Sequence, residues 1–157
     1  MNWQPYETKN EYGKVDFNKP LGAIKSDAAP ASASTAPPAP AGRRGKAGGV
    51  DYLKEVIAYA ATDFYAPEER EVELRLGSKN GWKVWLNGEF IFGRDEYHRG
   101  AQLDQYKLSC HLKKGRNTIL VKCCQNEQKE DWTVEWEFQL RVCDAAGTAI
   151  LAEAGNQ

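Results

Sequence analysis

Residues 132–142 read Trp-Thr-Val-Glu-Trp-Glu-Phe-Gln-Leu-Arg-Val, and every second residue in this stretch is apolar. Successive side chains point to opposite faces of a β-strand, so this alternation indicates one face in a core and one in water. Residues 71–76, 106–112 and 117–123 repeat the pattern. Because one buried and one solvated face is typical of antiparallel sheets, we predict an all-β fold, an antiparallel β-sandwich.

A hairpin is expected between two of these strands. Residues 82–86 and 89–92 are rich in apolar residues, and Asn87 and Gly88 join them. Asn-Gly supplies the two positive φ angles that a type I′ turn requires. Residues 52–65, rich in β-branched and aromatic side chains, add a further strand, and the sequence shows no long amphipathic helix.

The same alternation sorts the four cysteines. Cys110 and Cys123 fall in register with apolar residues and are predicted to point inward, whereas Cys124 and Cys143 are predicted to point outward. Adjacent cysteines that face opposite ways cannot share a zinc ion, and no Cys-x-x-Cys occurs, so we predict no zinc site. The inward pair acts as small hydrophobes or, in an oxidising compartment, takes part in a disulfide.

The chain divides by composition. Residues 27–49 hold four of the seven prolines and no aromatic residue, too little apolar surface to offset the entropy of ordering, so we predict a disordered insertion. Residues 1–26 are expected to contribute a first strand near Gly13–Asn18 to a single domain with the sandwich of residues 50–151. Residues 152–157 are expected to form a tail.

Charge and hydropathy exclude several classes of partner. The chain has 21 basic and 22 acidic residues and shows no basic stripe, so nucleic acid is not an expected partner. No apolar run reaches the roughly 20 residues that span a bilayer, so no membrane span is predicted. Residues 1–5 lack the charged and apolar regions of a signal peptide, and none is predicted.

Three segments resemble a known family: residues 72–77 (Val-Glu-Leu-Arg-Leu-Gly), 83–89 (Lys-Val-Trp-Leu-Asn-Gly-Glu) and 112–122 (Leu-Lys-Lys-Gly-Arg-Asn-Thr-Ile-Leu-Val-Lys). They are similar to the sugar-binding jelly-roll domain that precedes the catalytic barrel in β-galactosidase and β-glucuronidase type glycoside hydrolases, and to the wider galactose-binding-like superfamily. The resemblance covers about residues 52–144. It implies a jelly-roll, a non-catalytic role beside other domains of a parent protein, and an extracellular or periplasmic location.

The loop from Gly93 to Asp104 is the candidate carbohydrate site. Sugar hydroxyls require planar hydrogen-bonding groups, and the C–H face of a sugar requires an aromatic ring. Trp85, on the outward face of its strand, is a second candidate stacking platform or else a cover for an edge strand. The loop's charges alternatively form an internal ion-pair network, with Tyr97 packed on the sandwich rim. The candidate ligand-binding residues are Arg94, Asp95, Glu96, Tyr97, His98, Arg99, Asp104 and Trp85.

A second loop, residues 125–131, is the candidate metal site. Its side-chain oxygens, from Asn126, Glu127 and Asp131, suit calcium, which prefers several oxygen ligands. Domains of the resembled family often carry a structural calcium ion, so the resemblance implies calcium as the possible cofactor. The alternative is an ordinary solvated hairpin loop.

Catalysis is not expected. Glu135 and Glu137 lie two residues apart on a solvated strand face, which offers no contrast of environments to separate their pKa values. No Gly-x-Ser-x-Gly, phosphate-cradling loop or His-Glu-x-x-His occurs. Taken with the resemblance, which implies a larger, secreted bacterial parent protein, these features predict a non-catalytic carbohydrate-binding or accessory module. The alternative is a structural sandwich that docks neighbouring domains without binding sugar.

Overall fold

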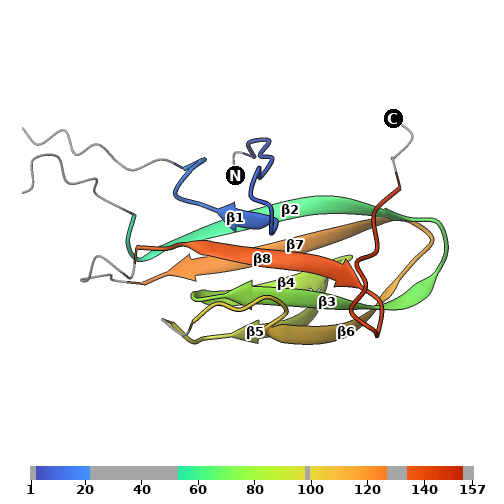
Figure 1. Ribbon diagram of the computed structural model, residues 1–157. Coiled ribbons are helices and arrows are strands. Elements are labelled where there is room, and N and C mark those ends of the chain that lie inside the picture. The colour runs from blue at the N-terminus through green and yellow to red at the C-terminus, as the bar shows by residue number, and fades with distance from the viewer. Residues whose placement is uncertain (1–2, 22–52, 98–99, 127–133, 154–157) are drawn as a thin grey trace, which may run out of the picture.

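The structure, a computed structural model, describes residues 3–21, 53–97, 100–126 and 134–153. Within them it forms two antiparallel four-stranded sheets and no helix, which confirms the predicted all-β sandwich (Figure 1). The first sheet has the order β1-β8-β3-β6 and the second has the order β2-β7-β4-β5. The strands are β1 (Lys14–Asp16), β2 (Val56–Ala66), β3 (Arg70–Ser78), β4 (Gly81–Leu86), β5 (Glu89–Arg94), β6 (Tyr106–Leu112), β7 (Gly115–Gln125) and β8 (Glu137–Cys143).

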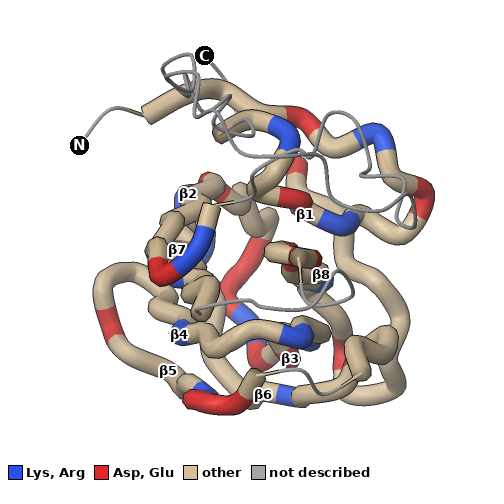
Figure 2. Tube along the Cα trace, turned by 90° about the vertical axis from the view of Figure 1, so that its left-hand side faces the viewer, with Lys and Arg blue, Asp and Glu red and all other residues tan. Residues whose placement is uncertain are grey.

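The strands pair in a nested way. β4 pairs with β5, β3 with β6, β2 with β7 and β1 with β8, as in one long ribbon folded back on itself. Two further pairings, β3 with β8 and β4 with β7, close that ribbon into two layers. Figure 2 shows the layers end-on, with β2, β7, β4 and β5 in one column and β1, β8, β3 and β6 in the other.

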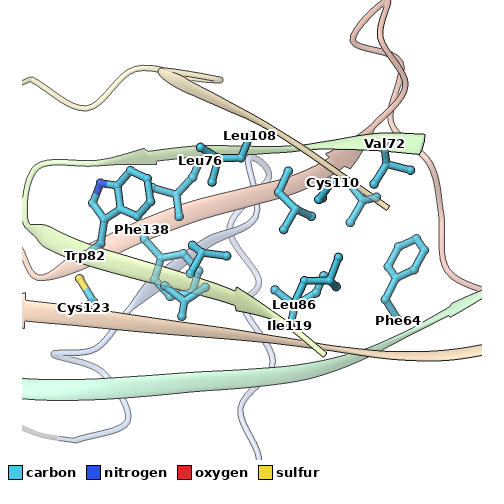
Figure 3. Packing of buried hydrophobic residues seen from close by; sticks show 14 of the residues in the cluster. Phe64, Val72, Leu76, Trp82, Leu86, Leu108, Cys110, Ile119, Cys123 and Phe138 are labelled. Atoms are coloured by element: carbon cyan, nitrogen blue, oxygen red, sulfur yellow. The ribbon is translucent and has the colours of Figure 1, made fainter. Parts of the chain in front are cut away.

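The core fills the space between the two sheets. Side chains from both layers point toward one another, as Figure 3 shows for Trp82, Ile119 and Leu86 of one sheet and Leu76 and Phe138 of the other. These positions are the apolar members of the alternating pattern, so the sequence-based assignment of inward faces is confirmed for β3, β4, β6 and β7. The largest side chains with almost no exposure are Trp82, Trp136, Leu74, Leu76, Leu112 and Ile119.

Two asparagines tie the turns to the sandwich. Asn87 and Gly88 have φ angles of 52° and 83°, as expected for the predicted β4–β5 turn. Asn87 Oδ1 accepts from the Thr118 amide at 2.9 Å, and Asn87 Nδ2 donates to Asn117 Oδ1 at 2.9 Å. Fully buried Asn117 also bonds both main-chain groups of Lys113 in the β6–β7 turn. The asparagines of the resemblance motif thus have a structural role here.

The last long strand is shorter than the sequence predicts. β8 begins at Glu137, Trp132 lies outside the described residues, and the preceding residues 134–136 form no ladder. This segment is held by one main-chain bond, from the Phe17 amide to the Trp136 carbonyl at 2.9 Å, and by side chains: Asn18 Nδ2 donates to the Val134 carbonyl at 2.9 Å, and Asn80 bonds the main chain on either side of Trp136. Trp136 still points inward as predicted.

The four cysteines lie on the faces that the sequence predicts. Cys110 and Cys123 are buried as expected, and burial raises the pKa of Cys123 to about 12. Cys143 lies on the outer face as predicted, opposite Glu73, but it is fully buried. Residues 144–150 turn back over it, and Ala149 bridges to it. Cys124 is half-buried, and all four thiols are free.

The N-terminal segment joins the first sheet. β1 lies within the stretch expected to supply a first strand, and its Val15 pairs with Phe138 of β8. The predicted insertion at residues 27–49 lies outside the described residues. The described residues contain no helix of the length and apolarity that a membrane crossing requires.

Candidate functional site

The outer face of the second sheet gathers aromatic and basic side chains. Strand register places Tyr59, Lys122 and Lys83 in one row across β2, β7 and β4. The next row holds Ala61, Leu120, Trp85 and Phe90. Directly opposed residues have Cβ atoms about 5 Å apart, so these two rows form one continuous surface. We call it the platform and include Tyr97, whose ring covers Gly81 on the same face; its members are Tyr59, Ala61, Lys83, Trp85, Phe90, Tyr97, Leu120 and Lys122.

Trp85 and Phe90 form the aromatic part of the platform. Their ring centroids lie 5.7 Å apart with an interplanar angle of 59°, and Phe90 is 53% exposed. A register shift between Val84 and Trp85 skips Ile91, so Phe92 faces the core side while Phe90 faces outward. Simple alternation places Phe90 and Phe92 on one face, which is why the sequence reasoning did not identify Phe90.

Lys83 lies over the exposed ring. Its Nζ is 5.8 Å from the Phe90 ring centroid, within the range of a cation–π contact. Gly93, opposite Lys83 in β5, makes this possible: a Cβ at Gly93 would lie 2.7 Å from Lys83 Cγ. The glycine therefore leaves the space that the lysine stem occupies.

Tyr97 brings the candidate loop onto the same face. A Cβ at Gly81, an outer-face position of β4, would lie 3.1 Å from both Cζ and Oη of Tyr97, so the ring covers Gly81. Gly81 pairs with Cys124, and burial, together with the neighbouring Cys124 and Asp95, raises the pKa of the Tyr97 phenol. Trp85, four residues along β4, is roughly 13 Å away. Two of the sequence-predicted site residues thus share one surface, with both lysines between them.

Arg94, Asp95 and Glu96, the other described residues at the start of the candidate loop, are placed differently. Arg94 is opposite Trp82 in register, and its guanidinium lies 5.5 and 5.6 Å from the ring centroids of Phe92 and Tyr106. Glu96 is 3.9 Å from Arg94, and Asp95 is exposed. His98 and Arg99 lie outside the described residues.

Asp104 binds to the first sheet, which is not the sheet that carries the platform. It accepts from Arg141 Nε at 3.0 Å and Arg75 NH1 at 3.2 Å, and Arg141 NH2 also bonds it. These two arginines hold the pKa of Asp104 below its usual range, Arg141 having the larger effect. Arg75 is also paired with Glu73 at 2.6 Å and is almost completely buried. The alternative of an internal ion-pair network therefore describes Asp104.

The candidate calcium loop is described only at Gln125, the last residue of β7, and at Asn126, whose carbonyl accepts from the Glu55 amide at 3.1 Å. Glu127 and Asp131 lie outside the described residues. In the part of the chain that is described, no three His, Cys, Asp or Glu side chains are grouped as a metal ion requires. Calcium binding at residues 125–131 stays a prediction.

Apart from the platform, the structure has a hollow between the two sheets, on the side where their edge strands β1 and β2 lie. It has a volume of about 370 Å³, and Val121, Phe138 and Leu140 form part of its apolar wall. Residues 59–62 of β2 and Trp3 and Tyr6 of the N-terminal segment also line it. Sequence periodicity cannot reveal this hollow, because it depends on how two edge strands from different sheets approach each other.

Comparisons with known proteins give no relative. No protein-family model matches the chain, and no match was found among the curated proteins or the solved structures. The function is therefore argued from the surfaces described above.

Proposed function

We propose that this chain is a non-catalytic carbohydrate-binding or accessory module of a larger protein, and that the platform receives the sugar. We further propose that its sandwich is a jelly-roll of the galactose-binding kind. The nested pairing supports this, because wrapping an eight-stranded antiparallel ribbon into two sheets produces the orders 1-8-3-6 and 2-7-4-5.

The exposed Phe90 ring beside Trp85 is the observation that carries the sugar proposal. A sugar offers an apolar C–H face and a rim of hydroxyls, so it suits a flat aromatic surface bordered by polar groups. Trp85 and Phe90 supply such a surface on a rigid sheet, and Lys83 supplies a hydrogen-bond donor at its border. Contiguous exposed apolar surface on a folded domain commonly marks an interaction site.

Calorimetric titration against a panel of oligosaccharides tests the proposal. Trp85→Ala is expected to weaken binding at least tenfold, since a central aromatic residue often carries much of the binding free energy. Tyr12→Ala is the matched control, because Tyr12 is also exposed but precedes β1 in the other sheet. Unchanged sugar affinity in a folded Trp85→Ala variant would move the site away from the platform.

The free edge of β2 favours a second function, docking of a neighbouring domain. Tyr65 accepts from the Glu153 amide, so its main-chain groups point away from β7. The main-chain groups of every second residue in a strand point to the same side, so those of Ile57, Tyr59, Ala61 and Asp63 also point away from β7. An extended segment of a neighbouring domain would pair with this edge and place its side chains in the 370 Å³ hollow.

Hydrogen exchange distinguishes this docking function. If a neighbouring domain adds a strand, the amides of Ile57, Tyr59, Ala61 and Asp63 are expected to exchange more slowly in the longer protein than in this chain. The intervening amides already bond to β7 and serve as internal controls. Equal exchange of the four amides in both proteins contradicts docking at this edge.

A further inference from the structure

Two lysines face each other at the centre of the platform. Lys83 of β4 and Lys122 of β7 are direct partners in register, which places their Cβ atoms roughly 5 Å apart. Lys83 is exposed and Lys122 is half-buried. Like charges in directly opposed positions destabilise a sheet, so this arrangement opposes folding instead of supporting it.

No described carboxylate relieves this repulsion. Asp63 is on the same face, but it is held by Arg116 at 3.0 Å and by the Thr118 hydroxyl at 3.0 Å. Two other lysines do have carboxylate partners: Lys14 pairs with Glu137 at 2.6 Å, and Lys79 pairs with Glu135. Lys83 and Lys122 form no ion pair with any described residue.

The lysines lie between aromatic groups that bind the ring of a sugar. Trp85 and Phe90 occupy the next row on one side, and Tyr97 covers Gly81 on the other side. By strand register these residues lie on the face of the β2-β7-β4-β5 layer that is turned away from the other sheet, and Tyr97 covers Gly81 on that face. A ligand stacked on the aromatic rings therefore lies beside two adjacent lysine positions, within reach of their flexible side chains.

We infer that the platform selects acidic carbohydrates, whose sugar rings stack on Trp85 and Phe90 while a carboxylate or sulfate binds between Lys83 and Lys122. This inference rests on the proposed function and adds the class of ligand. An anion bound between the lysines removes their mutual repulsion, so part of the affinity comes from relief of a strain present in the free protein. A neutral sugar cannot provide this gain.

Matched oligomers that differ only in charge provide the test. De-esterified oligogalacturonate is compared by calorimetry with the same oligomer after methyl esterification, which keeps the rings and removes the carboxylate charge. We expect the acidic oligomer to bind at least tenfold more tightly, with an affinity that falls as salt is added. A sulfated galactan oligomer forms a parallel arm: comparable binding assigns the site to anionic sugars in general, and weaker binding assigns it to uronates.

The lysines are tested by the double variant Lys83→Gln with Lys122→Gln. It is expected to lose the preference for the acidic oligomer and to melt at the same or a higher temperature, because the repulsion is gone. Lys107→Gln with Lys114→Gln is the control, since both residues are exposed and neither belongs to the platform. This control is expected to keep the preference, which shows that local charge and not net charge matters.

Three outcomes overturn the inference. Equal binding of both oligomers, lost in Trp85→Ala, leaves the sugar-binding proposal standing and removes the acidic selectivity. Binding of poly-glutamate as tight as that of the acidic oligomer and unaffected by Trp85→Ala shows a general anion surface. Absence of binding to every acidic and neutral sugar rejects the inference together with the proposed function.

Discussion

Asp104 shows how a single residue can join two strands through charge. Its carboxylate is 16% exposed, accepts from arginines of β3 and β8, and has a φ angle of 57°. Aspartate tolerates this left-handed conformation better than most residues. The loop that ends at Asp104 is thereby anchored to the outer face of the first sheet, where Gly77 accommodates the Gln102 carbonyl.

Asp104→Asn tests this anchor, since asparagine keeps the shape and the tolerance of a positive φ. Loss of the charge leaves Arg75 and Arg141 without a shared partner. We therefore expect the free energy of unfolding, measured with urea, to fall by about 3 kcal/mol. Asp95→Asn, at an exposed position, should change the stability by less than about 0.5 kcal/mol. A similar effect of both substitutions would show that the ion pairs do not support the fold.

The depressed pKa of Asp104 also sets a pH dependence. The stabilisation is complete above the carboxyl's unfolded pKa of about 3.9 and is lost as the pH falls through the lower folded value. The gap in stability between the wild-type chain and Asp104→Asn should therefore narrow in acid. A gap that stays constant down to the acid transition would contradict this linkage.

The stability that His111 contributes depends on pH with the opposite sign. Its Nδ1 lies 2.8 Å from Glu71 Oε1 and its Nε2 lies 2.8 Å from Glu69 Oε1. Both ring nitrogens can donate only in the imidazolium form, so the two carboxylates raise the pKa of His111, Glu71 having the larger effect. We expect an NMR titration midpoint above 6.5 that returns toward 6.5 in Glu71→Gln.

The stability linked to His111 follows from the same sign. A raised folded pKa means that its contribution is complete below the unfolded value near 6.5 and is lost as the pH rises through the folded value. Because the imidazole is exposed, the change in stability should be small. A titration midpoint at or below 6.5 would show that the two carboxylates do not hold the proton.

At the scale of elements, the register of β5 determines which aromatic side chains lie on the platform. A regular β5 would turn Phe90 and Phe92 to the same face, but the register shift at Ile91 sends them to opposite faces. Phe92 packs against Trp82 with ring centroids 6.1 Å apart, whereas Phe90 joins Trp85. One extra residue in an edge strand therefore adds an aromatic ring to the outer face without removing one from the core side.

The β4–β5 turn can be tested by Gly88→Ala. The φ of 83° at Gly88 is costly for any residue with a Cβ, and no neighbouring atom obstructs that Cβ, so the loss of stability reports backbone strain alone. We expect a loss of about 1 kcal/mol in urea unfolding. Gly100→Ala is the control, because Gly100 is exposed and has no positive φ. Equal stability of the two variants would argue against the type I′ geometry.

At the scale of the whole molecule, the reactivity of the buried cysteines shows whether the two sheets unfold together. Cys110 and Cys123 lie in the core between the layers, and Cys143 lies under the C-terminal turn. Burial raises the pKa of all three thiols, which lowers the thiolate fraction that reacts. Only the half-buried Cys124 lies near the surface.

Thiol labelling of the native protein should therefore be biphasic. At most one thiol, Cys124, is expected to react with an aromatic disulfide reagent before unfolding, and the other three should react at the rate of global unfolding. Cys124→Ser should remove the fast phase and leave the slow one. Rapid labelling of Cys143 in that variant would show that residues 144–150 leave it uncovered.

The sequence alone determined the all-β class, the inward faces of β3, β4, β6 and β7, and the Asn87–Gly88 turn. Each depends on local rules, since side-chain alternation and turn dihedrals involve residues that are close in the chain. Trp85 was identified as an outward aromatic for the same reason. These rules do not say which outer positions remain open.

Tertiary structure alone decided the burial of Cys143, the outward turn of Phe90 and the separation of Tyr97 from Asp104. Each depends on a segment that is distant in sequence or on a shift of register: residues 144–150 cover Cys143, and two arginines on different strands bind Asp104. The opposition of Lys83 and Lys122 is of the same kind, because strand pairing joins residues 39 positions apart. Alternation assigns a side chain to a face, and only the packed sheets decide what lies beside it or above it.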